Sequence, residues 1–139
     1  MKITDLPFNS FIGLVPSECS GYALSLPADL KYTNHLGTVH ASALLALAEA
    51  ASGDCLLNRF PEIGFEVVPV VRRLEAKFKK PANGEVFAIA AVADSIRTEF
   101  IATLTTKGRA LLTIDVEVHD STATPLLGVT VEWLVAKKP

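Results

Sequence analysis

The segment from Asn34 to Ser52 constrains the fold of this chain more than any other, because it continues into the longest helix-forming run of the sequence. The run, from about Val39 to Leu57, is rich in alanine and leucine on every side, and a helix that is apolar all round is buried all round. Between Ala41 and Ser52 this run carries one carboxylate, Glu49. An ionised group in such surroundings needs a partner, a raised pKa or a chemical role.

A polar cluster stands at the expected start of this helix, and Thr38 is the predicted N-cap. The first N–H groups of a helix have no internal partner and lie at its positive end. An N–H near Ala41 could therefore stabilise a developing oxyanion, and His40 could orient a substrate or donate a hydrogen bond. The alternative is that Asn34 and His40 only hold the loop in place.

One face of the helix carries Ser42, Leu45, Glu49 and Ser52, by the periodicity of an α-helix. A catalytic carboxylate is one interpretation of Glu49. The other is a structural ion pair with Arg72 or Arg73, since such networks also hold carboxylates in protein interiors.

The remainder of the chain is expected to be mostly strand. Alternating or continuously apolar runs predict strands over residues 18–26, 67–80, 85–93, 109–119 and 126–137. Short helices are expected over residues 1–14, with Asp5 as a cap, and 95–107, capped by Ser95. An Asn83-Gly84 pair marks a turn. This order predicts one domain, residues 1–139, of the α+β class, in which an antiparallel sheet of about five strands wraps one long buried helix.

Composition narrows the function classes. The chain has 139 residues and a net charge of −2, which gives no electrostatic argument for a nucleic-acid partner. No apolar run approaches the length of a membrane span or of a signal peptide, so a cytoplasmic protein with no membrane partner is expected. Its two cysteines suggest free thiols. An apolar fraction of 50% is high for so small a domain and favours a subunit interface.

These residues resemble a known pattern. The arrangement Asn34-x-x-Gly37-x-x-His40, followed by the small residues Ala41 and Ser42 and by an acid nine residues after the histidine, resembles the hotdog-fold thioesterases. In their phenylacetate-degradation subgroup the motif is N-x-x-G-x-x-H-G-G. The G-T-V-H-A segment and the K-G-R-A segment at 107–110 are also similar to a group of thioesterases related to the C-terminal domain of an acetyltransferase-linked protein.

The resemblance implies a hotdog fold, a homodimer or dimer of dimers with sites between subunits, and hydrolysis of an acyl-CoA thioester without metal or cofactor. Glu49 would be the nucleophile or the general base, the Ala41 N–H would polarise the carbonyl, and Asn34 and His40 would position the site. There are two departures from the subgroup. Ala41 and Ser42 replace paired glycines, and Glu49 replaces an aspartate.

A wider set of residues is expected to contact the substrate. The candidates are Gly37, Thr38, Ser42, Leu45, Arg72, Arg73 and Lys77. The last three belong to a basic stretch that continues to Lys79 and Lys80 and suits the phosphates of coenzyme A. A solvated strand face is the alternative for that stretch.

Two other functions remain open from the residues. One is a non-catalytic protein that binds acyl-CoA or an acyl carrier, in which Glu49 is a packed acid. The other is a hydratase or dehydratase on the same fold, with His40 as the base.

Overall fold

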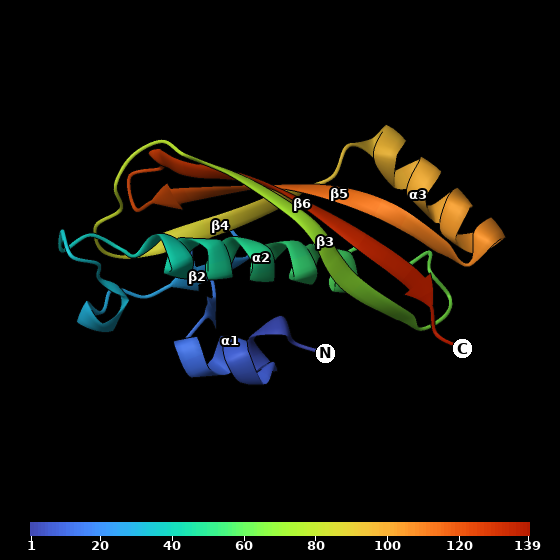
Figure 1. The fold of residues 1–139 in the computed structure, drawn as a ribbon, viewed down its shortest axis with the longest axis horizontal. Helices are drawn as coiled ribbons and strands as arrows, with labels where there is room; N and C mark the ends of the chain where they lie inside the picture. Colours follow the sequence, from blue (N-terminus) through green and yellow to red (C-terminus); the bar gives the residue numbers. More distant parts are fainter.

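The computed structural model describes residues 1–139, and its main feature is a curved antiparallel sheet that wraps one long helix (Figure 1). The elements follow in the order η1 (Ile3–Asp5), α1 (Pro7–Ile12), β1 (Val15–Pro16), β2 (Leu24–Leu26), η2 (Leu30–Tyr32), α2 (Ala41–Asn58), β3 (Val67–Phe78), β4 (Val86–Ala91), α3 (Asp94–Lys107), β5 (Arg109–Asp120) and β6 (Pro125–Lys137). The strands are arranged β1-β2-β4-β5-β6-β3. No helix is long and apolar enough to cross a membrane.

The expected α+β class and hotdog architecture are confirmed, but the sheet has six strands instead of about five. The extra strand is β1, which pairs with β2 through Val15 and Pro16 only. A two-residue strand leaves no alternating pattern in the sequence, so it could not be recognised there. The strand expected over residues 18–26 is shorter in the structure, where β2 covers only Leu24–Leu26.

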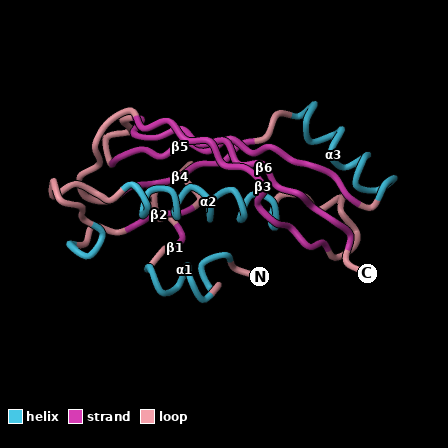
Figure 2. Tube along the Cα trace, viewed as in Figure 1, coloured by secondary structure: helices cyan, strands magenta, loops and turns pink.

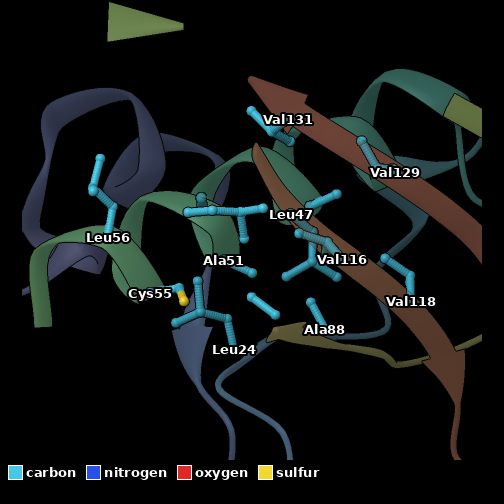
Figure 3. Close-up of a cluster of buried hydrophobic side chains, with 14 of the residues drawn as sticks. Leu24, Leu47, Ala51, Cys55, Leu56, Ala88, Val116, Val118, Val129 and Val131 are labelled. Atoms are coloured by element: carbon cyan, nitrogen blue, oxygen red, sulfur yellow. The ribbon is translucent and has the colours of Figure 1, made fainter. Parts of the chain in front are cut away.

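Helix α2 supplies one half of the core and the concave face of the sheet supplies the other. Leu47 and Ala51 of α2 are fully buried, and they lie beside valines of β5 and β6 such as Val116 and Val131 (Figure 3). Alternate residues along β5 and β6 are buried, as the sequence pattern predicted. The alanines let the helix backbone approach the sheet closely. The expected burial of the helix on every side is met only in part, because Ala43, Leu45 and Ala46 are half-buried and Ala41 and Ser42 are exposed.

The N-terminal segment covers α2 on the side away from the sheet, below the helix in Figure 1. Ile3 of η1 is buried against α2 at Gly53. A Cβ at Gly53 would lie 3.2 Å from Cδ1 of Ile3 and 3.6 Å from the indole of Trp133, so a larger residue there would require Ile3 to shift by a few tenths of an ångström. The C-terminal half of α2 is therefore packed between the N-terminus and β6.

A buried hydrogen-bond relay holds α2 in register with β6. The indole N–H of Trp133 donates to Oγ of Ser52 at 3.0 Å, and the Ser52 hydroxyl donates to the carbonyl oxygen of Glu49 at 2.7 Å. Both Ser52 and Trp133 are buried. This relay fixes the helix turn that carries Glu49 relative to the sheet.

The expected capping residues are wrong at three helix starts. His40, and not Thr38, caps α2, because its Nδ1 accepts the N–H of Ser42. The cap positions of α1 and α3 are Leu6 and Ala93, and neither Asp5 nor Ser95 forms a side-chain cap. Thr38 is instead bonded within the preceding loop.

The turn at Asn83-Gly84 does not join a hairpin, since β3 and β4 lie at distant places in the sheet. Helix α3 is confirmed over Asp94–Lys107 and ends at Gly108 in the left-handed conformation, with φ of 76°. It lies at the end of the sheet away from the start of α2 (Figures 1 and 2). The Arg97 guanidinium joins it to Glu62 in the loop after α2, with N–O distances of 2.6 and 2.7 Å.

We expect Ser52→Ala to destabilise the fold by about 1–3 kcal/mol, because it leaves the buried indole N–H of Trp133 without an acceptor. Urea unfolding followed by circular dichroism measures the change. Ser95→Ala is the matched control, since Ser95 is exposed and forms no side-chain hydrogen bond. Equal unfolding midpoints for the two variants would show that the relay contributes no stability.

Candidate functional site

The loop before α2 is organised around the side chain of Asn34. Its Oδ1 accepts the N–H groups of Leu36 and Thr38 at 2.9 and 3.1 Å, and its Nδ2 donates to the Thr38 hydroxyl at 2.9 Å. Gly37 has a φ of 76°, which a glycine adopts without strain. Asn34, Gly37 and Thr38 thus fix the path of the chain into the helix.

The start of α2 leaves one backbone donor unused. The N–H of Ser42 is bonded to Nδ1 of His40 at 3.0 Å, and those of Ala43 and Leu44 are bonded to the His40 carbonyl at 3.0 and 3.2 Å. The N–H of Ala41 donates to no group of the chain. This donor at the positive end of the helix is the one that the sequence singled out for an oxyanion.

The Ala41 donor borders a hollow of about 290 Å³ between the start of α2 and the end of β3. Asn34, Thr38 and Leu44 line it on the helix side, and residues 78–82 line it on the other. Lys79 and Lys80 are among the latter. The ammonium group of Lys79 turns over the outer face of the sheet, 3.9 Å from where a Cβ at Gly128 would lie, which leaves Lys80 as the lysine best placed at the hollow.

His40 and Ser42 lie at the border of a different hollow, of about 380 Å³, between α2 and α1. Because Nδ1 of His40 accepts a backbone N–H, the neutral imidazole carries its proton on Nε2 and can donate from there. Leu45 is half-buried and packs against the core.

Glu49 is half-buried on the side of α2 that faces the N-terminal segment. It forms no ion pair, so the interpretation as a structural pair with Arg72 or Arg73 is wrong for this chain. Burial raises the pKa of the Glu49 carboxyl, because removal from water disfavours the charged form. An unpaired acid with a raised pKa is typical of a functional site more than of a structural one.

Within one chain the acid and the helix-start donor are separate. Glu49 lies eight positions after Ala41, which is roughly 12 Å along the helix axis. Glu49 borders a pocket with Val67 and Pro69 at the start of β3, whereas Ala41 borders the hollow at Phe78 at its end. One bound carbonyl cannot reach both groups of the same chain.

The basic residues of β3 face away from this region. Arg73 is opposite Glu132 and Lys77 is opposite Gly128 on β6, and these positions alternate with the buried Val129 and Val131. Arg73 and Lys77 therefore project from the outer face of the sheet, away from α2. Arg73 is 3.6 Å from Glu75 there, and both side chains of this pair are largely exposed. Arg72 lies at the irregularity between Val71 and Arg73 and is exposed.

Strand β3 forms an edge of the sheet, with β6 as its only neighbour. It is 12 residues long, and its apolar side chains remain partly uncovered: Val70 is 50% exposed and Phe78 is 48% exposed. Long apolar edge strands are rare on monomers because they pair with other chains. This edge joins the hollow at Ala41 to the pocket at Glu49.

Sequence reasoning missed some residues that the structure brings to these hollows. Lys80 was seen only as part of a basic stretch. The contribution of the N-terminal segment to the surroundings of Glu49 was also missed, because no local pattern connects residues so distant in the chain. The structure contains no group of three or more His, Cys, Asp or Glu side chains that could hold a metal ion.

The raised pKa of Glu49 predicts a pH-dependent cost to stability. Folding favours the protonated carboxyl, so the cost is absent below the ordinary pKa of a free glutamate. The cost to stability appears as the pH rises from the ordinary pKa of glutamate to the raised pKa of Glu49. Above the raised pKa the cost has its full value. We therefore expect Glu49→Gln to raise the urea midpoint at pH 7, with a gain that disappears at acidic pH. The exposed control Glu75→Gln should stay within about 0.5 kcal/mol of the wild type, and an equal gain in both variants would contradict this cause.

Comparisons with solved structures find the same fold in other proteins. A Pseudomonas aeruginosa protein of unknown function, described as a probable thioesterase, aligns with a TM-score of 0.78 and 21% identity over 98% of this chain and 91% of that one. A Staphylococcus aureus protein described as a thioesterase enzyme, solved as a mutant, gives 0.65 and 18% over 95% and 98%. A Bacillus halodurans protein solved with CoA gives 0.60 and 18% over 81% and 65%.

These likenesses confirm the expected hotdog fold. A search of curated proteins gives no match. A family described as "Domain of unknown function (DUF4442)" matches residues 12–135, which is most of the chain. The chain belongs to this DUF4442 family, and its fold is the hotdog fold.

Proposed function

We propose that this protein is an acyl-CoA thioesterase that works as a homodimer. The observation that carries the proposal is the pair of unused groups on α2: the free N–H of Ala41 at the helix start and the unpaired, half-buried carboxylate of Glu49. An oxyanion donor and a nearby carboxylate are what the hydrolysis of an acyl bond needs.

A dimer would bring these two groups together. Glu49 lies near the beginning of the β3 edge and Ala41 near its end. If two copies pair antiparallel along β3, the beginning of one strand meets the end of the other. Glu49 of one copy then faces Ala41 of its partner, twice by symmetry. The exposed apolar side chains of β3 supply the reason for the strands to pair.

The chemistry follows from the two groups. The thioester oxygen accepts the Ala41 N–H, which stabilises the negative charge that develops when the carbonyl carbon is attacked. In one route Glu49 attacks this carbon directly, the carbon–sulfur bond breaks, and the resulting mixed anhydride is then hydrolysed by water, which regenerates the Glu49 carboxylate. In the other route Glu49 removes a proton from the water that attacks the carbon, and the carbon–sulfur bond then breaks. In both routes coenzyme A leaves as the thiol after its thiolate takes up a proton, and the acyl group is released as a carboxylic acid. A raised pKa makes Glu49 a stronger base near neutral pH than an exposed glutamate is.

His40 is better suited to donate a hydrogen bond than to act as a base. Its Nδ1 is occupied by the Ser42 N–H, so the neutral ring offers an N–H at Nε2. This observation favours hydrolysis over the hydratase alternative, which needs a free basic nitrogen at His40. Asn34 then has a positioning role, since its side chain shapes the loop that leads to His40 and Ala41.

Two considerations support coenzyme A as the leaving group. One similar structure, the Bacillus halodurans protein, was solved with CoA. In this chain Lys80 lines the hollow that also contains the free N–H of Ala41. An ammonium group there suits a phosphate of the coenzyme.

The test of the proposal uses two single variants. We expect Glu49→Gln to abolish thiol release from a panel of acyl-CoA thioesters, and Ala41→Pro to lower kcat by roughly 10²–10³. Proline at the first helix position removes only the N–H, and the extended conformation of His40, with ψ of 137°, accommodates a following proline. Circular dichroism checks that both variants are folded, and unchanged release from either variant would overturn its assigned role.

A mixing experiment tests whether the site is shared between subunits. Each variant alone is expected to have at most about 1% of the wild-type kcat, but a mixed dimer of Glu49→Gln and Ala41→Pro chains contains one site with both groups intact. Denaturing and refolding the two variants together should therefore recover about a quarter of the wild-type activity, by the statistics of random pairing. No recovery would contradict the shared site. Acyl-CoA binding by the wild type without thiol release, seen by calorimetry, would select the non-catalytic alternative.

We also expect Lys80→Glu to raise KM for acyl-CoA at least tenfold with little change in kcat, because it would repel the phosphates without touching the reacting atoms. The effect should weaken at high salt. The matched control is Lys107→Glu at the exposed end of α3, which should leave KM unchanged. If Lys80→Glu and Lys107→Glu raised KM equally, the increase in KM would be due to the net charge of the protein alone.

A further inference from the structure

The pocket that contains Glu49 is mostly apolar, and Asn9 is the other polar side chain in its lining. Its volume is about 220 Å³, and it is enclosed by parts of the chain that are far apart in sequence. Leu56 and Leu57 come from α2, Val67 and Pro69 from β3, and the indole of Trp133 from β6. The N-terminal segment closes the remaining side.

The N-terminal wall of this pocket is held firmly. Ile3 is 6% exposed and Asn9 is also 6% exposed, and Nδ2 of Asn9 donates to the Ile3 carbonyl at 3.0 Å. The carbonyl of Asn9 in turn accepts the N–H of Leu14 at 3.1 Å. Leu6, between Ile3 and Asn9, borders the pocket and keeps 37% of its surface exposed. The wall is therefore fixed by Ile3 and Asn9, and its exposed side chains at the rim are Leu6 and Met1, of which Leu6 is the more buried.

We propose that this pocket receives the acyl chain of the substrate and that Leu6 of the N-terminal segment limits its length. The inference rests on the proposed function, because it assumes that Glu49 stands at the reacting carbonyl. An apolar cavity beside a reacting carboxylate is a suitable environment for a hydrocarbon tail and an unsuitable one for a phosphate or a sugar.

The volume sets the size of the acyl group. A protein cavity of about 150 Å³ lined by apolar side chains holds benzene, which has six carbons. A pocket of about 220 Å³ therefore takes roughly six to nine carbons. The substrate class is then medium-chain acyl-CoA, with acetyl-CoA too small to fill the pocket and palmitoyl-CoA too long for it.

The first experiment measures kcat/KM for butyryl-, octanoyl-, dodecanoyl- and palmitoyl-CoA. The wild type should prefer octanoyl-CoA. Leu6→Ala should raise the ratio of kcat/KM for dodecanoyl-CoA to kcat/KM for octanoyl-CoA by at least fourfold, which corresponds to about one buried methylene group. Leu6→Phe should lower this ratio. Phe11→Ala is the matched control. Phe11 lies on α1 of the same segment but is 83% exposed and does not border the pocket, so the ratio should stay unchanged. An unchanged ratio in both Leu6 variants would overturn the inference.

The second experiment does not depend on catalysis. Trp133 is the only tryptophan of the chain, so selective excitation of the indole reports on this pocket. 8-Bromooctanoate should quench the fluorescence, because bromine quenches an indole at close contact, and Leu6→Phe should weaken the quenching more than Phe11→Ala does. Absence of quenching in the wild type would reject the acyl pocket even if thiol release is observed. Quenching without thiol release would support the pocket and reject the proposed hydrolysis.

Discussion

The rest of the structure depends on the need to cover α2 on every side. Its alanines and leucines gain free energy only when they leave water, so the sheet curves around one side of the helix and the N-terminal segment closes another (Figure 1). Glycine at position 53 permits this second contact, and the relay from Trp133 through Ser52 fixes the helix against β6. The same burial raises the pKa of Glu49, so the packing of the fold and the reactivity of the proposed site have one physical origin.

The helix start contributes a backbone N–H group that its cap leaves without a partner. His40 satisfies the N–H of Ser42 with its ring and two further N–H groups with its carbonyl, and only the Ala41 N–H remains. A side chain that capped this position as well would remove the donor. The replacement of paired glycines by Ala41 and Ser42 does not affect the argument, because the donor belongs to the backbone.

The single chain presents two half-sites and one edge strand that connects them. The 12 residues of β3 extend roughly 36 Å, and the two hollows lie at opposite ends of this strand. Antiparallel pairing of two such edges is the simplest arrangement that covers the exposed apolar side chains and also joins the carboxylate to the donor. Under this proposal, assembly and catalysis depend on the same strand. The proposed acyl pocket adds the N-terminal segment, which is joined to the core on the other side of α2.

The sequence by itself determined the long strands β3, β5 and β6 and the helix α3, because each has a periodic pattern that depends on local geometry. It determined the helix α2 through a long run of helix-forming residues that is apolar on every side. It also identified Glu49 and the Ala41 N–H, since an acid in an apolar helix and a free donor at a helix start are local facts. Only the tertiary structure decided that His40 replaces Thr38 as the cap, that Glu49 has no ion pair, and that Arg73 and Lys77 lie on the outer face of the sheet. It also brought Leu6 and Trp133 to the pocket of Glu49. These outcomes depend on contacts between residues far apart in the chain, and the periodicity of one segment carries no information about which distant segment will pack against it.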